Sequence, residues 1–239
     1  PTSPPGEKPT FLGFVVLFSA EDPELIGPWL ACAGPGHGKP QILGRGGPRA
    51  SGPYIRLQPI RQRPHSNETL PPLSSPKISR SQLHVKVTDA RELEVTSVGR
   101  ASMLVNGVKT NQGVLRSGDL IEVGSGLLLL CTERPHRIQG HGQRPVHPFG
   151  AADPEGFVGE PLAAWALRRE VAFAATHTGH VLVIGATGTG KELVAKALHS
   201  LSNPKGPLVS RNASTIPESL ADAELFGNVK GYPNPGMAE

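Results

Sequence analysis

Residues 185–191, GATGTGK, have the glycine and lysine spacing G-x-x-x-x-G-K of a phosphate-binding loop. Gly188 and Gly190 let the backbone turn sharply, so that its N–H groups face a phosphate, and Lys191 adds a full positive charge. The apolar run 180–185 predicts a strand before the loop, and a helical pattern follows it. The motif therefore predicts that a nucleotide phosphate is bound by Gly185, Ala186, Thr187, Gly188, Thr189, Gly190, Lys191 and Glu192.

Glu192 stands where the general motif has a serine or threonine, whose hydroxyl helps to hold Mg²⁺. Two flanking stretches explain this departure: GFVGE at 156–160 and ESLADAELFGNVKG at 218–231. Together with the loop, they resemble the AAA+ domain of sigma-54-interacting transcriptional activators, a family that commonly has glutamate at this place. The resemblance covers about residues 156–231.

The resemblance implies ATP, bound with Mg²⁺, as the cofactor. It also implies ATP hydrolysis by a ring-shaped homo-oligomer that remodels the sigma-54 RNA polymerase complex. Asn212, in SRNAS, matches the family's asparagine that senses the nucleotide beside the catalytic acid, and is the candidate catalytic residue. The alternative is a polar residue at a strand end that satisfies nearby backbone groups.

The residues after ELFGNVKG depart from this family. The family continues with a GAFTGA loop that touches the sigma factor, whereas this sequence reads GYPNPGMAE at 231–239. The two prolines stiffen the chain, which argues against contact with sigma-54 in the usual manner. No apolar strand ending in Asp-Glu, arginine finger or helix-turn-helix follows, so we expect weak nucleotide binding and poor hydrolysis. Two interpretations stay open: an enzyme whose reading frame continues past Glu239, and an adaptor without turnover.

Three short motifs in the first half combine arginine, serine and asparagine with turn residues: ILGRG at 42–46, KISRSQLHV at 77–85 and SMLVNGV at 102–108. Hydrogen bonds from arginine to phosphate are charge-assisted and strong, so arginines suit recognition of a phosphorylated side chain. The three motifs resemble those of forkhead-associated (FHA) domains, which are β-sandwiches that read phosphothreonine.

By position, the FHA resemblance implies that Arg45 and Ser79 contact the phosphate, with Arg80 close by, and that Asn106 holds the peptide main chain. The implied partner is a protein that carries phosphothreonine. Gln82 takes the place of the family's histidine, which braces the loop, and this change weakens the motif. The alternative is a sandwich of the same shape that contacts proteins without binding phosphate.

The surrounding elements define a multidomain chain: an all-β FHA-type sandwich over 10–136, a Pro/Gly/His-rich linker over 137–155, and an α/β P-loop AAA+ part over 156–239. The first region has short apolar or alternating runs between turn residues, as in a β-sandwich, and its Asn-Gly pair favours a tight hairpin. From 156 the pattern becomes strand, glycine loop, helix and strand, as in a parallel α/β domain. We expect helices at 161–177, 191–202 and 218–227, and strands at 180–185 and within 206–214.

Composition narrows the classes of function. A net charge of +4 without a concentrated basic stripe gives no DNA-binding motif, and no run is long enough to span a membrane. Cys32 and Cys131 are the only cysteines, which favours a reducing, cytoplasmic location and predicts neither a disulfide nor a zinc site. The linker histidines are expected to be solvated, so no metal site is predicted. The sequence thus indicates a bacterial signalling regulator that couples phosphothreonine sensing to an ATP-binding module.

Overall fold

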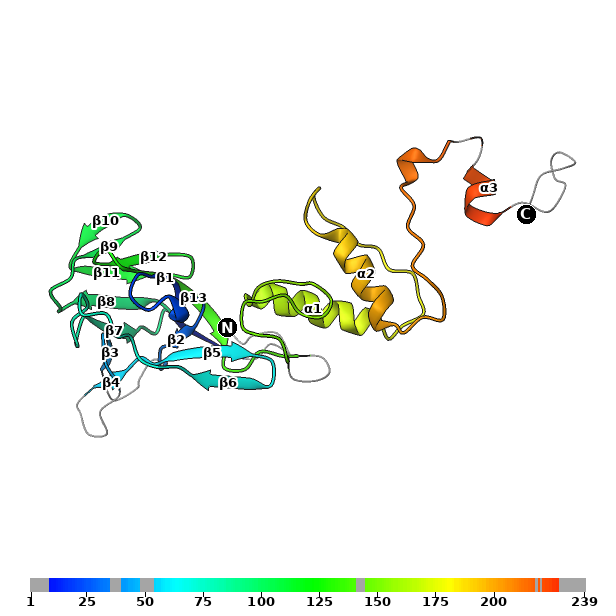
Figure 1. Ribbon diagram of the computed structural model, residues 1–239. Helices are drawn as coiled ribbons and strands as arrows, with labels where there is room; N and C mark the ends of the chain where they lie inside the picture. Colours follow the sequence, from blue (N-terminus) through cyan, green and yellow to red (C-terminus); the bar gives the residue numbers. More distant parts are fainter. Residues whose placement is uncertain are drawn as a thin grey trace, which may run out of the picture.

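The computed structural model describes residues 9–34, 40–47, 54–140, 145–217, 219 and 221–227. Within these residues, thirteen strands form a β-sandwich up to Pro135, and three α-helices follow it along the chain. Figure 1 shows the sandwich at one end, α1 and α2 packed beside each other, and α3 standing apart from both.

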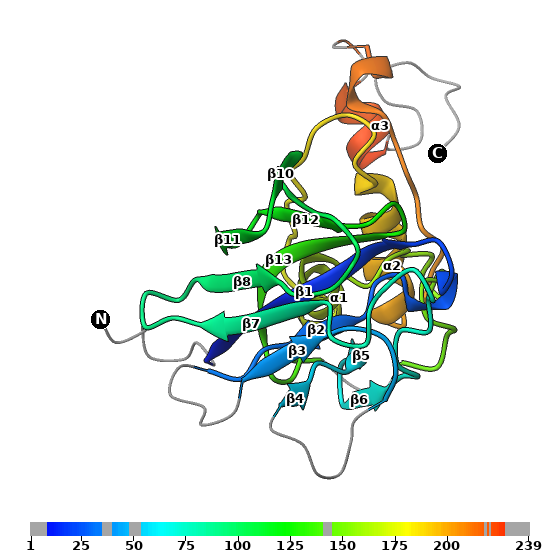
Figure 2. The same ribbon diagram turned by 90° about the vertical axis from the view of Figure 1, so that its left-hand side faces the viewer.

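The larger sheet has eight strands. In spatial order they are β10 (Val108–Thr110), β9 (Met103–Val105), β12 (Leu120–Val123), β13 (Leu127–Pro135), β1 (Thr10–Ser19), β2 (Trp29–Ala31), β5 (Pro59–Arg63) and β6 (Ser66–Thr69). The smaller sheet has five strands: β11 (Gln112–Leu115), β8 (Leu93–Ser97), β7 (Leu83–Val87), β3 (Gln41–Leu43) and β4 (Ile55–Arg56). All described strand pairs are antiparallel except β3 with β4 (Figure 2).

The core lies between the two sheets. In β13, buried and half-buried residues alternate, so that Leu127, Leu129 and Cys131 face inward, as the period of two in a strand requires. They pack with Phe14 of β1 and Leu83 of β7, which are also fully buried. The all-β sandwich predicted from the sequence is therefore confirmed.

The Asn-Gly pair forms the predicted hairpin between β9 and β10. Val105 pairs with Val108, which leaves Asn106 and Gly107 as a two-residue loop. Both have positive φ, +49° and +82°, the combination that an Asn-Gly turn supplies most readily.

The C-terminal part contains the three predicted helices: α1 (Leu162–Ala174), α2 (Lys191–Leu201) and α3 (Ala221–Phe226). α1 and α2 share a small apolar core formed by Phe157, Val171, Val194 and Ala197. Two short 3-10 helices, η1 (Pro23–Leu25) and η2 (Ala213–Thr215), complete the described elements.

The two strands predicted around α2 are not formed. Residues 180–185 and 206–214 pair with no strand in the part of the chain that the structure describes, and Leu182 and Ile184 are 83% and 84% exposed. A strand is stabilised by hydrogen bonds to a neighbouring strand, and none of the described strands lies beside these segments. The prediction of strands at 180–185 and within 206–214 was therefore wrong, because an apolar run without a pairing partner does not form a strand.

No helix among the described residues is long and apolar enough to cross a membrane. Both cysteines are buried and free. Burial raises the pKa of the Cys131 thiol to about 12, so this group stays protonated at neutral pH.

Candidate functional sites

A cavity of about 390 Å³ opens beside the residues that the FHA resemblance assigns to phosphate binding. We call it the arginine cavity. It is lined by Arg45, Gly46, Gly47, Arg56, Pro72, Leu73, Ser74 and Arg80. Three of these described lining residues are arginines and none is an aspartate or glutamate, so the cavity is suited to an anion.

Close backbone contact brings two of the predicted motifs together. Arg45 follows β3 and its N–H donates to the carbonyl of Ser79 (3.2 Å). Gly44 is required just before it, because a Cβ at this position would overlap the carbonyl oxygens of Ser79 and Arg80. The structure therefore places Arg45 and Arg80 on one cavity with Ser79 beside them.

Two further residues of the arginine cavity were not predicted from the sequence. Arg56 ends β4, and its Nη1 donates to the carbonyl of Arg80. Ser74 is held by the buried carboxylate of Asp22, which accepts from its N–H (3.0 Å) and its hydroxyl. The parallel pairing of β3 with β4 brings Arg56 here, and no short sequence motif reports such a pairing.

The loop that carries Ser79 is braced by Gln82. The Gln82 side chain is fully buried; its Oε1 accepts from the Ser79 N–H (3.2 Å) and its Nε2 donates to the Ala101 carbonyl (2.9 Å). The amide of Gln82 therefore connects two loops by hydrogen bonds, and the effect of this residue on phosphate binding stays a prediction. Ser79 Oγ also accepts from the Arg100 N–H (3.0 Å), which places another arginine of the β8–β9 loop beside this site.

Asn106 is not among the residues that line the arginine cavity. Its Nδ2 donates to Asp119 Oδ1 (2.9 Å) and its Oδ1 accepts from the Leu120 N–H (2.9 Å). The N–H of Arg116 and then the Asn106 amide lower the pKa of Asp119, which keeps the acceptor ionised. The described contacts of Asn106 thus join two turns, and its role toward a peptide stays a prediction.

The phosphate loop, residues 185–191, has the local geometry that its glycines predict. Gly188 and Gly190 have φ of +80° and +85°, and Gly190 is the residue before the first turn of α2. Thr189 Oγ1 donates to the Ala186 carbonyl (2.8 Å), which closes the loop. The loop therefore presents a helix N-terminus with exposed N–H groups, the arrangement that binds phosphate.

Lys191 points back into its own loop. Its Nζ donates to the carbonyls of Gly185 (3.1 Å) and Ala186 (2.7 Å). These are weak partners for an ammonium compared with a phosphate oxygen, so an anion bound at this helix end would compete for the lysine. Glu192 is exposed in the first turn of α2, where a negative charge is stabilised by the helix dipole.

Asn212 caps η2. Its Oδ1 accepts from the N–H (3.1 Å) and the hydroxyl (2.9 Å) of Ser214, and its carbonyl accepts from Thr215. These bonds match the alternative of a polar residue that satisfies nearby backbone. The nucleotide-sensing role of Asn212 stays a prediction.

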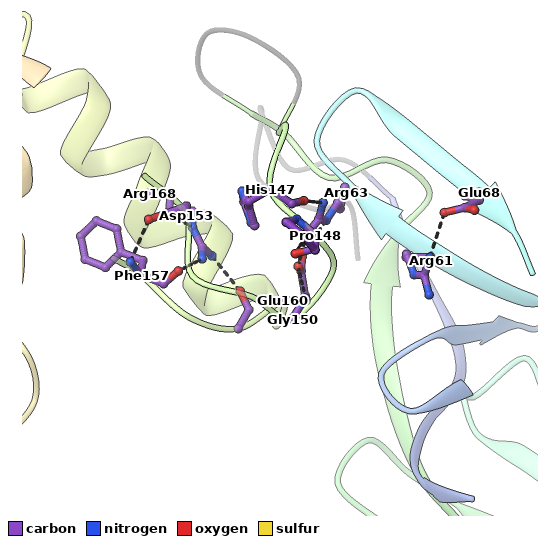
Figure 3. A network of polar contacts seen from close by, with 11 residues as sticks. Arg61, Arg63, Glu68, His147, Pro148, Gly150, Asp153, Phe157, Glu160 and Arg168 are labelled. Carbon is purple, nitrogen blue, oxygen red and sulfur yellow. Dashed lines mark hydrogen bonds and ion pairs between the residues drawn. The ribbon is translucent and has the colours of Figure 1, made fainter. Parts of the chain in front are cut away.

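A network of polar contacts joins the sandwich to the residues before α1 (Figure 3). Arg63, the last residue of β5, forms an ion pair with Glu160, and both side chains are about nine-tenths buried, with 11% and 10% exposed. Arg63 also donates to the carbonyls of His147 (2.6 Å) and Pro148 (2.9 Å). Glu160 accepts from the Gly150 N–H (2.9 Å) as well. We call these contacts the linker network.

A second arginine, Arg168 of α1, fixes the other end of the linker. It pairs with Asp153 (2.6 Å) and donates to the carbonyls of Phe157 (2.7 Å) and Gly159 (2.8 Å). Its guanidinium also lies over the ring of Trp165, 4.5 Å from the centroid. The described part of the linker is therefore docked against both neighbours, whereas its composition suggested solvated residues.

His147 packs inside this network. Its ring stacks on Trp165 with centroids 6.0 Å apart, and its Nε2 is buried without a hydrogen-bond partner among the described residues. Burial, and then the charge of Arg63, lower the pKa of His147 below its usual 6.5. No group of three or more metal-ligating side chains is found in the described residues, and His147 is engaged with an aromatic ring.

The C-terminal part of the chain matches the model of a known protein family. Residues 157–233 match the family model of the Sigma-54 interaction domain. The phosphate loop, residues 185–191, lies within the matched residues. The predicted departure from the family at 231–239 lies outside the described residues.

The relatives are transcription regulators. The chain is 43% identical to the anaerobic nitric oxide reductase transcription regulator NorR of Klebsiella pneumoniae (strain 342) over 98 residues, which cover 40% of this chain and 19% of the relative. It is 45% identical to NorR of Escherichia coli O6:H1 (strain CFT073) over 110 residues, which cover 46% of this chain and 21% of the relative. The chain thus spans about a fifth of the length of these curated relatives.

The N-terminal half is similar to solved FHA domains. The FHA domain of the CT664 protein from Chlamydia trachomatis is 18% identical and covers 52% of this chain and 98% of its own, with a TM-score of 0.35. The N-terminal FHA domain of S. cerevisiae Rad53p, solved with a phosphothreonine peptide, is 15% identical over 52% of this chain and 94% of its own, with a TM-score of 0.34. Similarity at this level is no evidence for the fold. The assignment of a β-sandwich rests on the strand order and pairing.

Proposed function

We propose that this chain is part of a bacterial transcription regulator in which the sandwich binds a phosphothreonine peptide and the phosphate loop binds ATP. The observation that carries the first half is the arginine cavity, where Arg45, Arg56 and Arg80 converge with no carboxylate in the described lining. The match of residues 157–233 to the Sigma-54 interaction domain supports the second half.

Phosphate binding at the arginine cavity follows from its donors. Arg45 and Arg80 supply guanidinium N–H groups, and Ser79 supplies a hydroxyl on the loop between them. Arg45 Nε is buried without an acceptor among the described residues, and a phosphate oxygen would supply one. A buried donor without an acceptor is unfavourable, so a bound phosphate would stabilise this loop arrangement. Asn106 is proposed to contact the peptide main chain.

ATP would be held by the backbone of Gly185, Ala186, Thr187, Gly188, Thr189 and Gly190, together with Lys191. The positive φ of the two glycines and the helix N-terminus fit the phosphates. Mg²⁺ would bind together with the nucleotide and would neutralise part of the negative charge of the phosphates. These loop residues would bind and orient the phosphates.

The partners follow from the same proposal. The sandwich would read a phosphorylated protein in the cytoplasm, and the AAA+ part would assemble with copies of itself and act on the sigma-54 RNA polymerase complex. Peptide binding would then bias assembly or ATP turnover. The relatives matched by the C-terminal part are transcription regulators, which supports this setting.

Isothermal titration against a degenerate phosphothreonine peptide library tests the first half. We expect binding that is lost when the threonine is not phosphorylated and when Arg45 is replaced in Arg45→Gln. Lys86→Gln is the control, because Lys86 pairs with Glu94 on the exposed face of β7 and its loss removes the same charge elsewhere. Binding that does not depend on phosphate would overturn the proposal.

A second candidate is a phosphopeptide-binding adaptor without turnover. The sequence at 231–239 supports it, because two prolines stand where the sigma-54 activators continue with the loop that touches the sigma factor. Titration with a fluorescent ATP analogue separates the two: peptide binding without nucleotide binding supports the adaptor, and nucleotide binding followed by phosphate release supports the enzyme.

A further inference from the structure

The turn at 153–160 contacts both the sandwich and α2. At its end, Glu160 forms the ion pair with Arg63 of β5 that belongs to the linker network. In its middle, Phe157 is buried in the small apolar core together with Val194 of α2. This turn is therefore a direct connection between the linker network and the helix that follows the phosphate loop.

The 153–160 turn is held in one shape by its own hydrogen bonds and by Arg168 of α1 (Figure 3). The Asp153 N–H donates to the Phe157 carbonyl (3.0 Å), and Asp153 Oδ1 accepts from the Phe157 N–H (2.8 Å). Arg168 pairs with the same carboxylate and donates to the carbonyls of Phe157 and Gly159. The side chains of Arg168 and Asp153 are only 11% and 6% exposed. Removal of the arginine would leave a buried carboxylate without its ion pair, so Arg168 holds the turn firmly.

The 153–160 turn approaches α2 close to the lysine of the phosphate loop. Leu193 lies two residues after Lys191, and a Cβ at Gly156 would lie 3.1 Å from Leu193 Cδ1. Gly156 also has a φ of +90°, which residues with a side chain rarely adopt. A shift of the turn against α2 therefore acts within one helical turn of Lys191.

Among the described residues, few side chains from outside α2 contribute to its apolar core. They are Phe157, Val171 of α1 and the partly buried Val183. The segments 180–185 and 206–214, on either side of α2 in the sequence, pair with no described strand. Protein cores are close-packed, so a shift of Phe157 displaces α2 and the loop N–H groups at its start.

We propose that Arg63, Glu160 and Arg168 are positioning residues for nucleotide binding. Docking of the linker holds the 153–160 turn against α2, and the turn in this way orients the phosphate loop; the three residues act through the turn and not on the nucleotide itself. This inference rests on the proposed binding of ATP by the loop. Because coupling between two sites is reciprocal, bound nucleotide strengthens docking of the linker by the same factor as docking strengthens nucleotide binding.

Hydrogen exchange of the unaltered protein tests the reciprocal effect. A saturating concentration of a non-hydrolysable ATP analogue with Mg²⁺ is expected to slow exchange of the amides in 145–160 by about fivefold or more, the lower end of common coupling factors. Lys191→Ala, which removes the lysine of the phosphate loop, should show no such protection at the same concentration.

Titration with a fluorescent ATP analogue tests the positioning residues. Arg63→Ala and Arg168→Gln are each expected to weaken nucleotide binding by about fivefold or more. Lys86→Ala, on the exposed face of β7, and Glu170→Gln, at an exposed position of α1, remove one charge from the same two parts of the chain and should bind as the unaltered protein does. If Arg168→Gln loses helical circular dichroism, Arg63→Ala decides, because Arg63 belongs to the sandwich.

The outcomes are distinguishable. Nucleotide binding without protection of 145–160, or with full affinity in Arg63→Ala, overturns this inference and leaves the proposed ATP binding intact. Weakened binding in Arg168→Gln alone assigns that residue a structural role in α1 and likewise overturns the coupling. Absence of nucleotide binding by the unaltered protein overturns the proposed ATP binding, and this inference falls with it.

Discussion

Gln82 shows how one buried amide can stabilise a recognition loop. Its two hydrogen bonds connect the N–H of Ser79 with the carbonyl of Ala101, on loops that are far apart in the sequence. Gly99 has no side chain here because a Cβ would overlap the Gln82 amide. The three residues are therefore packed as one unit, and a change at any of them moves Ser79.

We predict that Gln82→Ala lowers the free energy of unfolding by about 2 kcal/mol, because it leaves two partly buried backbone groups without these partners. Phosphopeptide affinity is expected to fall as well, since Ser79 loses its support. Chemical denaturation and peptide titration measure the two effects. Gln112→Ala, at an exposed position in β11, is the control and should change neither; an unchanged Gln82→Ala would show that the amide does not brace the loop.

Lys191 is the residue on which nucleotide binding depends in this proposal. Lys191→Ala is expected to abolish binding of a fluorescent ATP analogue, a loss of at least about tenfold, because the phosphates lose their only full positive charge from the loop. Lys196→Ala removes the same charge from an exposed position on the same helix and should bind as the unchanged protein does. Equal binding by both variants refutes the assignment of the loop.

The candidate binding residues could be predicted from the sequence only where a short motif carries them. Arg45, Ser79 and Arg80 came from motifs that resemble those of FHA domains, and the structure places Arg45 and Arg80 on one cavity with Ser79 beside them. Arg56 and Arg100 were missed because strand pairing and a loop contact, both distant in sequence, bring them to the site.

Strands were predicted correctly where apolar residues alternate in a way that suits packing between two sheets. The prediction failed where strand formation depends on a neighbouring strand. The runs that became β1, β7 and β13 alternate or are fully apolar, and each has antiparallel neighbours to satisfy its backbone. The run at 180–185 has the same apolar character but no described neighbouring strand, so Val181, Leu182 and Ile184 are exposed, and only Val183 packs against the small core of α1 and α2. The hydrophobic pattern of a segment indicates a preference for burial. Tertiary contacts determine whether the segment is in fact buried.

The hairpin of β5 and β6 extends the larger sheet beyond β2 and ends at the linker network. We predict that Arg63→Ala weakens docking of the linker by on the order of 3 kcal/mol, because it leaves Glu160 buried without its ion-pair partner. Hydrogen exchange of amides in 145–160 measures the docking. Glu160→Gln, added to Arg63→Ala, should restore part of the loss, and a strictly additive loss would contradict the pairing.

Docking of the linker should also depend on pH through His147. Its pKa is lowered in the docked state, so the undocked state binds a proton more readily, and docking weakens as the pH falls below 6.5. The charged groups around it are Arg63, Glu160, Arg168 and Asp153. Although burial raises the pKa of Glu160, hydrogen bonds from Arg63 and Gly150 bring it below 4.5, so Glu160 stays ionised in this range.

We therefore expect hydrogen exchange in 145–160 to speed up between about pH 7.5 and 5.5, after correction for the intrinsic pH dependence of exchange. His147→Gln removes the titrating group and should give a flat corrected profile. A profile that remains pH-dependent in His147→Gln would assign the effect to another group.

One short segment connects the arginine cavity with the linker network. Arg56 contributes to the arginine cavity, and Arg63, seven positions later, contributes to the linker network. Arg56 ends β4 in the smaller sheet, whereas Pro59 and Ile60 begin β5 and pair with β2 in the larger sheet, so this short segment crosses from one sheet to the other. We predict that a ligand at the cavity shifts the docking of the linker through this connection, without a contact to it.

Binding of a phosphothreonine peptide is accordingly expected to change hydrogen exchange in 145–160, with the sign reporting whether the peptide tightens or loosens docking. Arg63→Ala should bind the peptide with nearly unchanged affinity but lose this response, because the cavity is intact and the far contact is gone. Lys86→Ala, which removes a charge from the exposed face of β7, should keep both. If Arg63→Ala still transmits the response, the coupling between the sandwich and the AAA+ part does not pass through β5, and another contact has to carry it.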